Sequence, residues 1–277
     1  MKVLISLLRR IKRRVALKRR INRIYCLVTG QYVSCNLCGW IGKRLASDIW
    51  HPETICPDCG SQVRHRLLCA AMTHLDGLTF EQLARNKTIL HFAPEPALRQ
   101  KLQCYTTEYL AADYLAEGYQ YKLDMQTDLS NMHNVRAEQI DLLVACDVLE
   151  HMPDHLGALR EIYRVLKYGG WAVLTVPQKD NLEKTFEDSA ANTPQERERL
   201  FGQHDHLRIY GNDFSGLLTE LGFKVRQICE TDFAPELVRK NVLFPPHLST
   251  HPLATNYRKV FFAHKVCPAQ NDRTGKI

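Results

Sequence analysis

The sequence predicts an α/β fold, in which a doubly wound parallel sheet follows a small cysteine-rich unit and a basic helix. From residue 88 onward, short apolar runs alternate with segments of helical periodicity, which implies parallel strands with helices on both faces of the sheet. The run IDLLVACD at residues 140–147 is apolar and bounded by acids, as expected for a strand buried on both faces. Two C-x-x-C pairs precede this part of the chain.

The composition is that of an ordinary globular protein, with 45% hydrophobic and 24% charged residues in 277. This length allows one large domain, or one domain with a small appendage. The net charge of +7 is concentrated in residues 1–25, which hold ten lysines and arginines and no acid, so the rest of the chain is slightly acidic. We recognise no signal peptide and no apolar run of 18 residues, and we expect a reducing, cytoplasmic setting.

Residues 1–28 predict a basic amphipathic helix, because Leu4, Leu8, Ile11 and Val15 recur at helical spacing among the basic residues. Three interpretations stay open. The helix lies on an anionic membrane surface, with residues 1–25 contacting the headgroups, or it packs as a solvated helix on its own domain. The third and least favoured interpretation is contact with RNA phosphates.

The cysteine pairs predict a structural zinc site within a ribbon at residues 29–70. Their spacing is C-x2-C-x17-C-x2-C, and a glycine follows the second cysteine of each pair. A two-residue gap lets a tight turn aim two thiolates at one tetrahedral ion, and glycine relieves the crowding in that turn. The predicted ligands of Zn²⁺ are Cys35, Cys38, Cys56 and Cys59.

The remaining elements fall within a predicted domain of residues 71–277. Strands are expected at residues 88–94, 109–113, 140–147, 171–177, 224–229 and 259–266, and helices at residues 95–102, 156–166 and 214–221. Asp154 is a predicted N-cap for the second of these helices, and Gly169 with Gly170 is its predicted stop.

Residues 140–177 carry a resemblance to a known family. The piece D-V-L-E-H, a helix ending in L-K-x-G-G and a strand ending in V-P resemble the central block of class I S-adenosylmethionine-dependent methyltransferases of the type 11-like group. The two-histidine piece FGQHDHLRIYG at residues 201–211 and the cysteine-rich unit resemble a subset with an N-terminal zinc ribbon. The resemblance implies a Rossmann-like sheet with S-adenosylmethionine bound across the carboxyl ends of its first strands.

The turn after the first strand of this domain has no glycine, although the family has a G-x-G there. Ala93 and Glu95 stand in place of the first two glycines, and His91 stands where an acid is common. Glu95 would repel a phosphate, but it suits a cofactor that carries a sulfonium and an amino group, which argues against NAD or ATP. The departure keeps a second interpretation open, a non-catalytic scaffold that has lost the cofactor.

Other cofactor contacts are expected at the ends of the next strands. Asp113 lies 20 residues beyond Ala93 and is the predicted acceptor for the ribose hydroxyls. By resemblance, Asp124 accepts from the adenine amino group, Met125 lines the adenine, and Cys146 ends the strand that borders the site. Asp113 as a helix cap is the competing interpretation.

The acceptor of the methyl group is expected to be a hydroxyl or a small-molecule nucleophile. The reason is that enzymes of the family that methylate base amino groups have Asn-Pro-Pro-Tyr where this chain has Cys146-Asp147-Val148-Leu149-Glu150-His151. On a helix, Asp147, Glu150 and His151 share one face, so His151 acts as general base or the group holds a divalent cation. The alternative is that Glu150 and His151 only brace the loop. His206 follows a polar stretch typical of a lid and is predicted to face the acceptor.

The sequence therefore predicts an S-adenosylmethionine-dependent methyltransferase with a structural zinc. Its acceptor is expected to be a small molecule, a glycan or a glycolipid precursor. The alternatives are an RNA methyltransferase that grips RNA through the ribbon, which the acidic body of the chain disfavours, and the non-catalytic scaffold.

Overall fold

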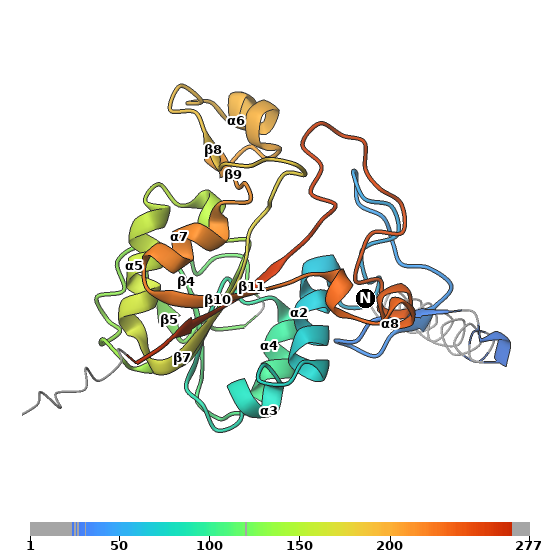
Figure 1. Ribbon diagram of the computed structural model, residues 1–277, viewed down its shortest axis with the longest axis horizontal. Coiled ribbons are helices and arrows are strands. Elements are labelled where there is room, and N and C mark those ends of the chain that lie inside the picture. Colours follow the sequence, from blue (N-terminus) through green and yellow to red (C-terminus); the bar gives the residue numbers. More distant parts are fainter. Residues whose placement is uncertain (1–23, 25, 27, 31, 120, 268–277) are drawn as a thin grey trace, which may run out of the picture.

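The structure is a computed structural model that describes residues 24, 26, 28–30, 32–119 and 121–267 (Figure 1). Most of the predicted basic helix at residues 1–28 lies outside the described residues, and Ile24, Cys26, Val28 and Thr29 are helical. In the described part of the chain, no helix is both long and apolar enough to cross a membrane.

The cysteine-rich unit is a small ribbon, which we define as residues 32–62. Its two strands, β1 (Val33–Ser34) and β2 (Ile41–Gly42), pair antiparallel. Because so short a hairpin has little core of its own, it packs on α8 (Pro235–Asn241) from the far end of the sequence.

A seven-stranded mixed sheet forms the centre of the molecule, in the order β10-β11-β7-β6-β3-β4-β5. The strands are β3 (Ile89–Phe92), β4 (Tyr109–Asp113), β5 (Met125–Gln126), β6 (Ile140–Cys146), β7 (Leu166–Thr175), β10 (Phe223–Ile228) and β11 (Val260–Lys265). Strands β3 to β7 run parallel to one another, as predicted, whereas β11 is antiparallel to both β7 and β10. The late strands therefore make the sheet mixed, and the predicted α/β fold with a doubly wound sheet is confirmed.

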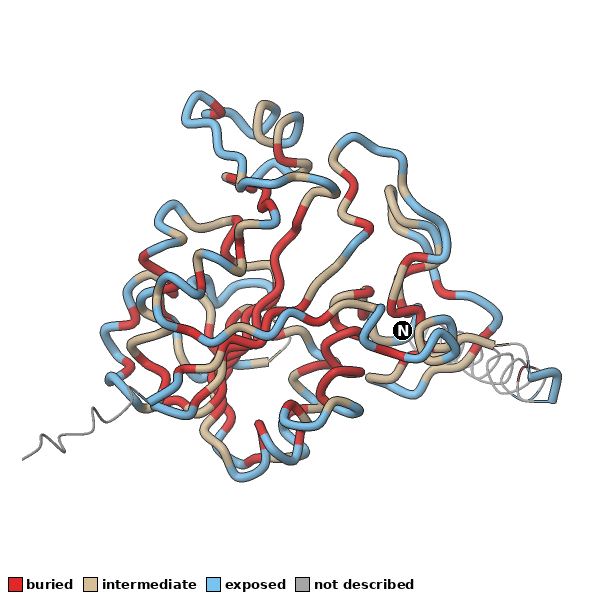
Figure 2. The backbone as a smooth tube through the Cα atoms, in the orientation of Figure 1, coloured by how far each residue is buried: buried red, intermediate tan, exposed pale blue. Residues whose placement is uncertain are grey.

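Helices cover both faces of the sheet, which confirms the doubly wound arrangement. On one face pack α2 (Val63–His74), α3 (Phe80–Leu83) and α4 (Pro96–Gln103), and on the other α5 (His155–Val165) and α7 (Phe214–Glu220). Alternate residues of β6 serve the two cores: Leu142 and Val144 face the first, and Leu143 and Ala145 the second. The buried residues of Figure 2 accordingly concentrate along the central strands.

Two local expectations meet different outcomes. Asp154 caps α5 as predicted, because its carboxylate accepts a hydrogen bond from the Gly157 amide at 2.7 Å. The predicted stop at Gly169 and Gly170 is wrong, since α5 ends at Val165 and β7 begins at once. The glycines instead occupy an irregular stretch of β7, where the pairing with β6 shifts register and Gly169 has φ +83°.

Between β7 and α7 the chain leaves the sheet as an excursion, residues 178–211, at the top of Figure 1. It contains β8 (Phe186–Glu187), α6 (Pro194–Phe201) and β9 (Arg208–Ile209). A bridge between Gln178 and Tyr210 closes its base. The polar segment expected to form a lid thus folds into a small hairpin and helix of its own.

Candidate functional site

A cleft of about 500 Å³ opens where β3, β4 and β6 end, and we call it the strand-end cleft. Among its lining residues are Ala93, Asp113, Tyr114, Asp128, Asp147 and His151. This is the crevice at which open α/β sheets bind ligands. Of the predicted cofactor residues, Ala93 and Asp113 therefore line the cleft.

The glycine-free turn is held by contacts that replace the freedom of glycine. Ala93 adopts φ +45°, a left-handed conformation that costs an L-residue about 1–2 kcal/mol. Its amide donates to the carbonyl of Ala112 on β4 at 2.9 Å, and the hydroxyl of Tyr121 donates to the carbonyl of Pro94. These contacts thus hold Ala93 in a backbone conformation that glycine adopts without such support.

Glu95, at the N-cap of α4, lies beneath the turn between two histidines and not among the residues that line the cleft. Its Oε1 lies 2.7 Å from His65 Nε2 on α2, and its Oε2 lies 3.2 Å from His91 Nε2 on β3. Burial opposes ionisation, yet His65 and His91 together hold the pKa of Glu95 well below its usual range. Glu95 is therefore ionised, and its carboxylate connects the turn to His65 and His91.

His91 is itself fully buried, with Nδ1 at 2.8 Å from the hydroxyl of Tyr109. Cys146 is buried at the end of β6, where burial raises the pKa of its thiol. Neither residue lines the strand-end cleft, so the structure places both in its supporting layer.

The carboxylates near the end of β4 differ in position. Asp113 accepts from the Tyr114 amide at 2.6 Å and from the Tyr119 hydroxyl, and it borders the cleft. Asp124 accepts from the amide of Ala111 at 2.8 Å, and neither it nor Met125 lines the cleft.

Asp128 and Leu129 occupy that side of the strand-end cleft instead. Sequence reasoning also missed Tyr114 and Leu115, whose exposed side chains border the cleft directly after β4. Their signal was available, since a large apolar pair follows the strand-end acid.

Asp147, at the end of β6, is a largely but not fully buried anion between two arginines. Its carboxylate accepts from the Thr175 hydroxyl at 2.7 Å and from Arg258 at 2.5 Å, with Arg64 at 3.3 Å. Burial opposes ionisation, but Arg258 and Arg64 hold the pKa of Asp147 well below its usual range. Asp147 also has φ +53°, in the left-handed region that Asp and Asn tolerate best among residues with a side chain.

The expected shared helix face of Asp147, Glu150 and His151 is wrong. The segment Leu149–His151 is a single 3-10 turn, η1, and the arginines draw Asp147 away from the other two. Glu150 and His151 meet His206 from the excursion instead, with all their candidate ligand atoms within 4.8 Å of one another. The structure therefore unites the three predicted catalytic residues.

Electrostatics within this cluster differ from residue to residue. Burial, and then the charge of Asp147, raise the pKa of Glu150 well above its usual range, which favours its protonated form. Burial lowers the pKa of His206 to about 4, so this imidazole is neutral. His151 is more exposed, and its Nδ1 lies 3.2 Å from a carboxylate oxygen of Asp205. His151 is thus the member of the cluster with both a carboxylate partner and access to solvent.

The excursion is tied to η1 by backbone contacts. The Arg208 guanidinium donates to the carbonyls of Leu149 at 2.9 Å and Met152 at 2.5 Å, and the Leu207 amide donates to the Glu150 carbonyl at 2.9 Å. Arg208 therefore positions the cluster without lining its pocket.

A second pocket, of about 360 Å³, lies beside the cluster between the excursion, the ribbon and the segment before β11, and we call it the ribbon-side pocket. Its lining includes Trp50, His51, Arg64, Glu150, His206 and Arg258. Asp147 and His151 line both this pocket and the strand-end cleft. The two cavities therefore adjoin at these two residues.

The ribbon-side pocket also gathers polar atoms that have no hydrogen-bond partner within the described residues. They are His51 Nε2, Arg64 Nε, Glu150 Oε2 and His206 Nδ1, all buried. Unpartnered buried polar groups cost about 1–3 kcal/mol each, so a polar partner at these atoms would stabilise the site. Trp50 adds an aromatic wall, stacked on His251 at 4.3 Å between ring centroids.

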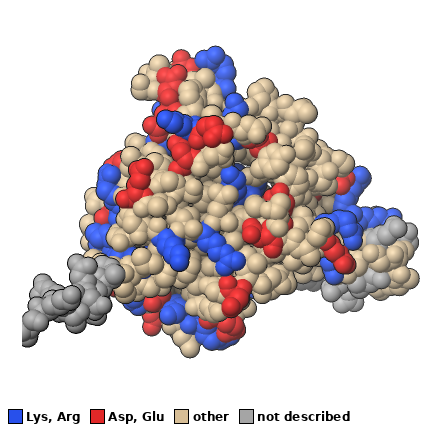
Figure 3. Space-filling model, viewed as in Figure 1, with Lys and Arg blue, Asp and Glu red and all other residues tan. Residues whose placement is uncertain are grey.

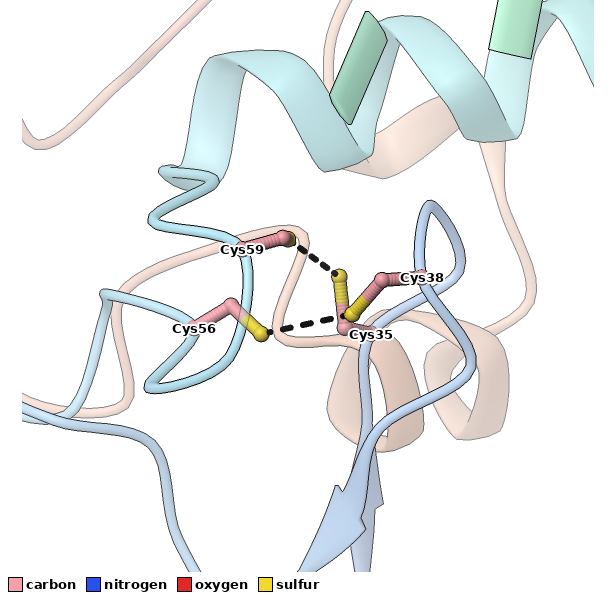
Figure 4. A group of neighbouring side chains, drawn as sticks. All are labelled: Cys35, Cys38, Cys56 and Cys59. Carbon is pink, nitrogen blue, oxygen red and sulfur yellow. Dashed lines mark hydrogen bonds between the residues drawn. The ribbon is translucent and has the colours of Figure 1, made fainter. Parts of the chain in front are cut away.

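The four predicted zinc ligands converge from two loops of the ribbon (Figure 4). The Sγ atoms of Cys35 and Cys59 are 3.7 Å apart, and those of Cys38 and Cys56 are 3.6 Å apart. A tetrahedral zinc with Zn–S bonds of about 2.3 Å has S–S edges of about 3.8 Å. These separations fit such an ion and are far longer than the roughly 2.05 Å of a disulfide.

The profile of a protein family described as "Methyltransferase domain" matches residues 79–228. Among solved structures, the chain is similar to the YcgJ protein from Bacillus subtilis, at 12% identity and a TM-score of 0.46, over 73% of this chain and 100% of that one. It is also similar to an S-adenosylmethionine-dependent methyltransferase from Mesorhizobium loti, at 14% identity and a TM-score of 0.44, over 65% of this chain and 92% of that one. No curated protein sequence matches the chain significantly.

Proposed function

The chain belongs to the methyltransferase domain family and is an S-adenosylmethionine-dependent methyltransferase, and from this premise we propose that its acceptor is a hydroxyl group bound in the ribbon-side pocket. The acceptor is a small molecule, a glycan or a glycolipid precursor. The observation that carries the proposal is the junction of the two cavities at His151. Methyl transfer is an in-line displacement, so donor and acceptor have to meet from opposite sides at one point.

The strand-end cleft suits the cofactor. Asp113 offers a carboxylate to ribose hydroxyls, and the apolar side chains around it suit an adenine ring. Bound there, S-adenosylmethionine supplies an electrophilic methyl group on a sulfonium. No side chain of the glycine-free turn projects a cation into the cleft, which is consistent with a positively charged cofactor.

His151 is the general base in this proposal. An alcohol has to lose its proton as its oxygen attacks the methyl carbon, and a positioned imidazole contributes typically 10²–10⁴-fold to such a step. Asp205, 3.2 Å from Nδ1, orients the ring and stabilises the imidazolium that forms. The neutral Glu150 and His206 line the acceptor side and offer hydrogen bonds to a second polar group of the acceptor.

The metal is part of the proposal as well. Cys35, Cys38, Cys56 and Cys59 would hold one structural zinc, because four cysteine thiolates complete a closed tetrahedral site. Metal analysis of the purified protein should find about one zinc per chain, and Cys38→Ser should lose it, whereas Cys104→Ser, at an exposed cysteine outside the cluster, should not. A ribbon that stays folded without metal would refute this assignment.

The face of the molecule shown in Figure 3 gives no support to an RNA acceptor. On the face shown in Figure 3, Lys and Arg are interspersed with Asp and Glu and form no continuous basic track. RNA-binding proteins need such a track to neutralise phosphates.

A labelled-methyl assay tests the proposal. Purified protein and S-adenosylmethionine labelled in the methyl group are incubated with separate pools of nucleotide sugars, phenols and RNA, and fragmentation mass spectrometry locates the methyl group in the product. We expect label on an oxygen of a low-molecular-weight compound, and loss of that product with His151→Ala. Label in RNA, or on nitrogen or carbon, would refute the hydroxyl acceptor. Failure to bind S-adenosylhomocysteine in calorimetry would support the scaffold interpretation instead.

A further inference from the structure

The first turn of α2 joins the ribbon to the methyltransferase site through three consecutive side chains. The helix begins four residues after the last cysteine of the cluster. Arg64 reaches Asp147 at the junction of the two cavities, His65 reaches Glu95 under the cofactor turn, and Arg66 reaches back into the ribbon. One helical turn therefore touches the cluster segment and both sides of the active site.

Arg66 fixes this turn to the ribbon. Its side chain is fully buried, and its guanidinium donates to the carbonyls of Ser61 at 2.7 Å, Thr54 at 2.8 Å and Val242 at 3.0 Å. Ser61 in turn lies against the cluster, with its Oγ at 3.1 Å from Cys35 Sγ. A buried guanidinium needs these acceptors, so displacing the second cysteine loop would strand it.

The first cysteine loop docks on the same helix. Asn36, between Cys35 and Cys38, donates its side-chain amide to the Arg66 carbonyl at 2.8 Å. Both loops of the cluster thus position the start of α2, and a metal that held the loops together would also set the position of His65.

The hydrogen bonds of His65 show which of its two ring nitrogens contacts Glu95, next to the glycine-free turn. The backbone amide of Gln62 donates a hydrogen bond to His65 Nδ1 at 3.1 Å, so Nδ1 is an acceptor. The ring proton is therefore on Nε2, which donates to Glu95 at 2.7 Å. His65 is thus the N3 residue of a capping box and the anchor of Glu95 at once. Glu95 lies two residues after Ala93, whose left-handed backbone needs such outside support.

We propose that His65 is a positioning residue through which the metal-bound ribbon holds the glycine-free turn in its binding conformation, so that cofactor affinity depends on the metal. The inference rests on the proposed metal at the cysteine cluster. It assigns the ribbon a function in the methyltransferase reaction itself, and it accounts for a cofactor turn that functions without glycine.

Four variants of the full-length chain test the link, with S-adenosylhomocysteine binding measured by calorimetry and metal content measured in parallel. Cys38→Ser should lose the metal and bind the cofactor product about tenfold more weakly, whereas the control Cys104→Ser should match the parent in both. His65→Asn keeps the metal but is too short to reach Glu95, and it should show about the same tenfold loss. His65→Gln, which can both cap the helix and reach Glu95, should restore binding.

Combining Cys38→Ser with His65→Asn should weaken binding no further than either change alone, since both act through one contact. Thermodynamic reciprocity supplies a readout on the unmodified protein: if the metal raises S-adenosylhomocysteine affinity tenfold, S-adenosylhomocysteine raises metal affinity tenfold. The chelator concentration that removes the metal, followed with a colorimetric indicator, should rise accordingly in the presence of S-adenosylhomocysteine.

The outcomes distinguish failure of the proposed metal site from failure of the proposed link through His65. If the purified chain holds no metal, the metal assignment fails, and His65→Asn still reports whether His65 sets the turn. If metal leaves while affinity for S-adenosylhomocysteine stays the same, or if His65→Asn and His65→Gln bind equally well, the link is wrong.

Discussion

Asp147→Asn removes one largely buried negative charge while keeping the shape of the side chain. Asn tolerates the left-handed backbone at φ +53°, and its amide oxygen can still accept from the Thr175 hydroxyl. The bond from Arg258 at 2.5 Å becomes a contact between two donors, and Arg64 loses its carboxylate partner. The side chains of Asp147, Arg258 and Arg64 are 13%, 11% and 15% exposed, so water can replace little of what is lost.

Removing one partner of a buried ion pair typically costs about 3–5 kcal/mol, and the partial exposure here favours the lower end, about 3 kcal/mol. At about 2–4 °C per kcal/mol for a domain of this size, Tm should fall by about 6–12 °C. Urea unfolding at pH 7 measures the free-energy difference. Asp154→Asn is the matched control, because Asn caps a helix as well as Asp and this side chain is 63% exposed.

The same comparison predicts a pH dependence. The folded-state pKa of Asp147 is lowered, so its stabilising charge is fully present above the ordinary carboxyl pKa of about 3.9 and is lost as the pH falls through the folded-state pKa. The stability gap between the parent and Asp147→Asn should therefore be constant from pH 7 to about pH 5 and close in stronger acid. A variant within about 0.5 kcal/mol of the parent at pH 7 would refute the view of Asp147 as the anion that holds Arg64 and Arg258.

Three further changes test other parts of the site. Asp113→Ala should weaken S-adenosylmethionine binding at least about tenfold in calorimetry, because it removes a charge-assisted acceptor. Asp124→Ala, at a residue that does not line the cleft, should weaken binding less. The reverse order would refute the placement of the cofactor in the strand-end cleft. His151→Gln should lower the rate of methyl transfer about 10²–10⁴-fold and leave the dissociation constant of S-adenosylmethionine unchanged, and a rate close to that of the parent would exclude His151 as the base. Glu150→Gln should raise the free energy of unfolding at pH 7 to 8. The folded-state pKa of Glu150 is raised, so the parent loses stability as the pH rises above about 4.3, whereas the variant has no carboxyl to ionise. A stability difference between parent and variant of zero at both pH 4 and pH 8 would contradict a protonated Glu150.

Patterns close together in the sequence were sufficient for much of the fold. The spacing of Cys35, Cys38, Cys56 and Cys59 predicted a cluster that the structure forms, because each pair needs only a local turn. The apolar run at residues 140–147 predicted a strand buried on both faces, and β6 lies at that place in the sheet. These features depend on residue type and short-range geometry, which a single sequence contains.

The contacts that build the site join residues far apart in the chain, and only the tertiary structure decided them. The sequence could name Glu150, His151 and His206 as candidates, but the excursion had to fold back before His206 met the other two. Likewise, Asp147 could have joined them on a helix, and it is Arg258, 111 residues away, that holds it elsewhere. Charged groups buried in a low-dielectric interior take the partners that packing brings to them, and local spacing carries no record of which partners those are.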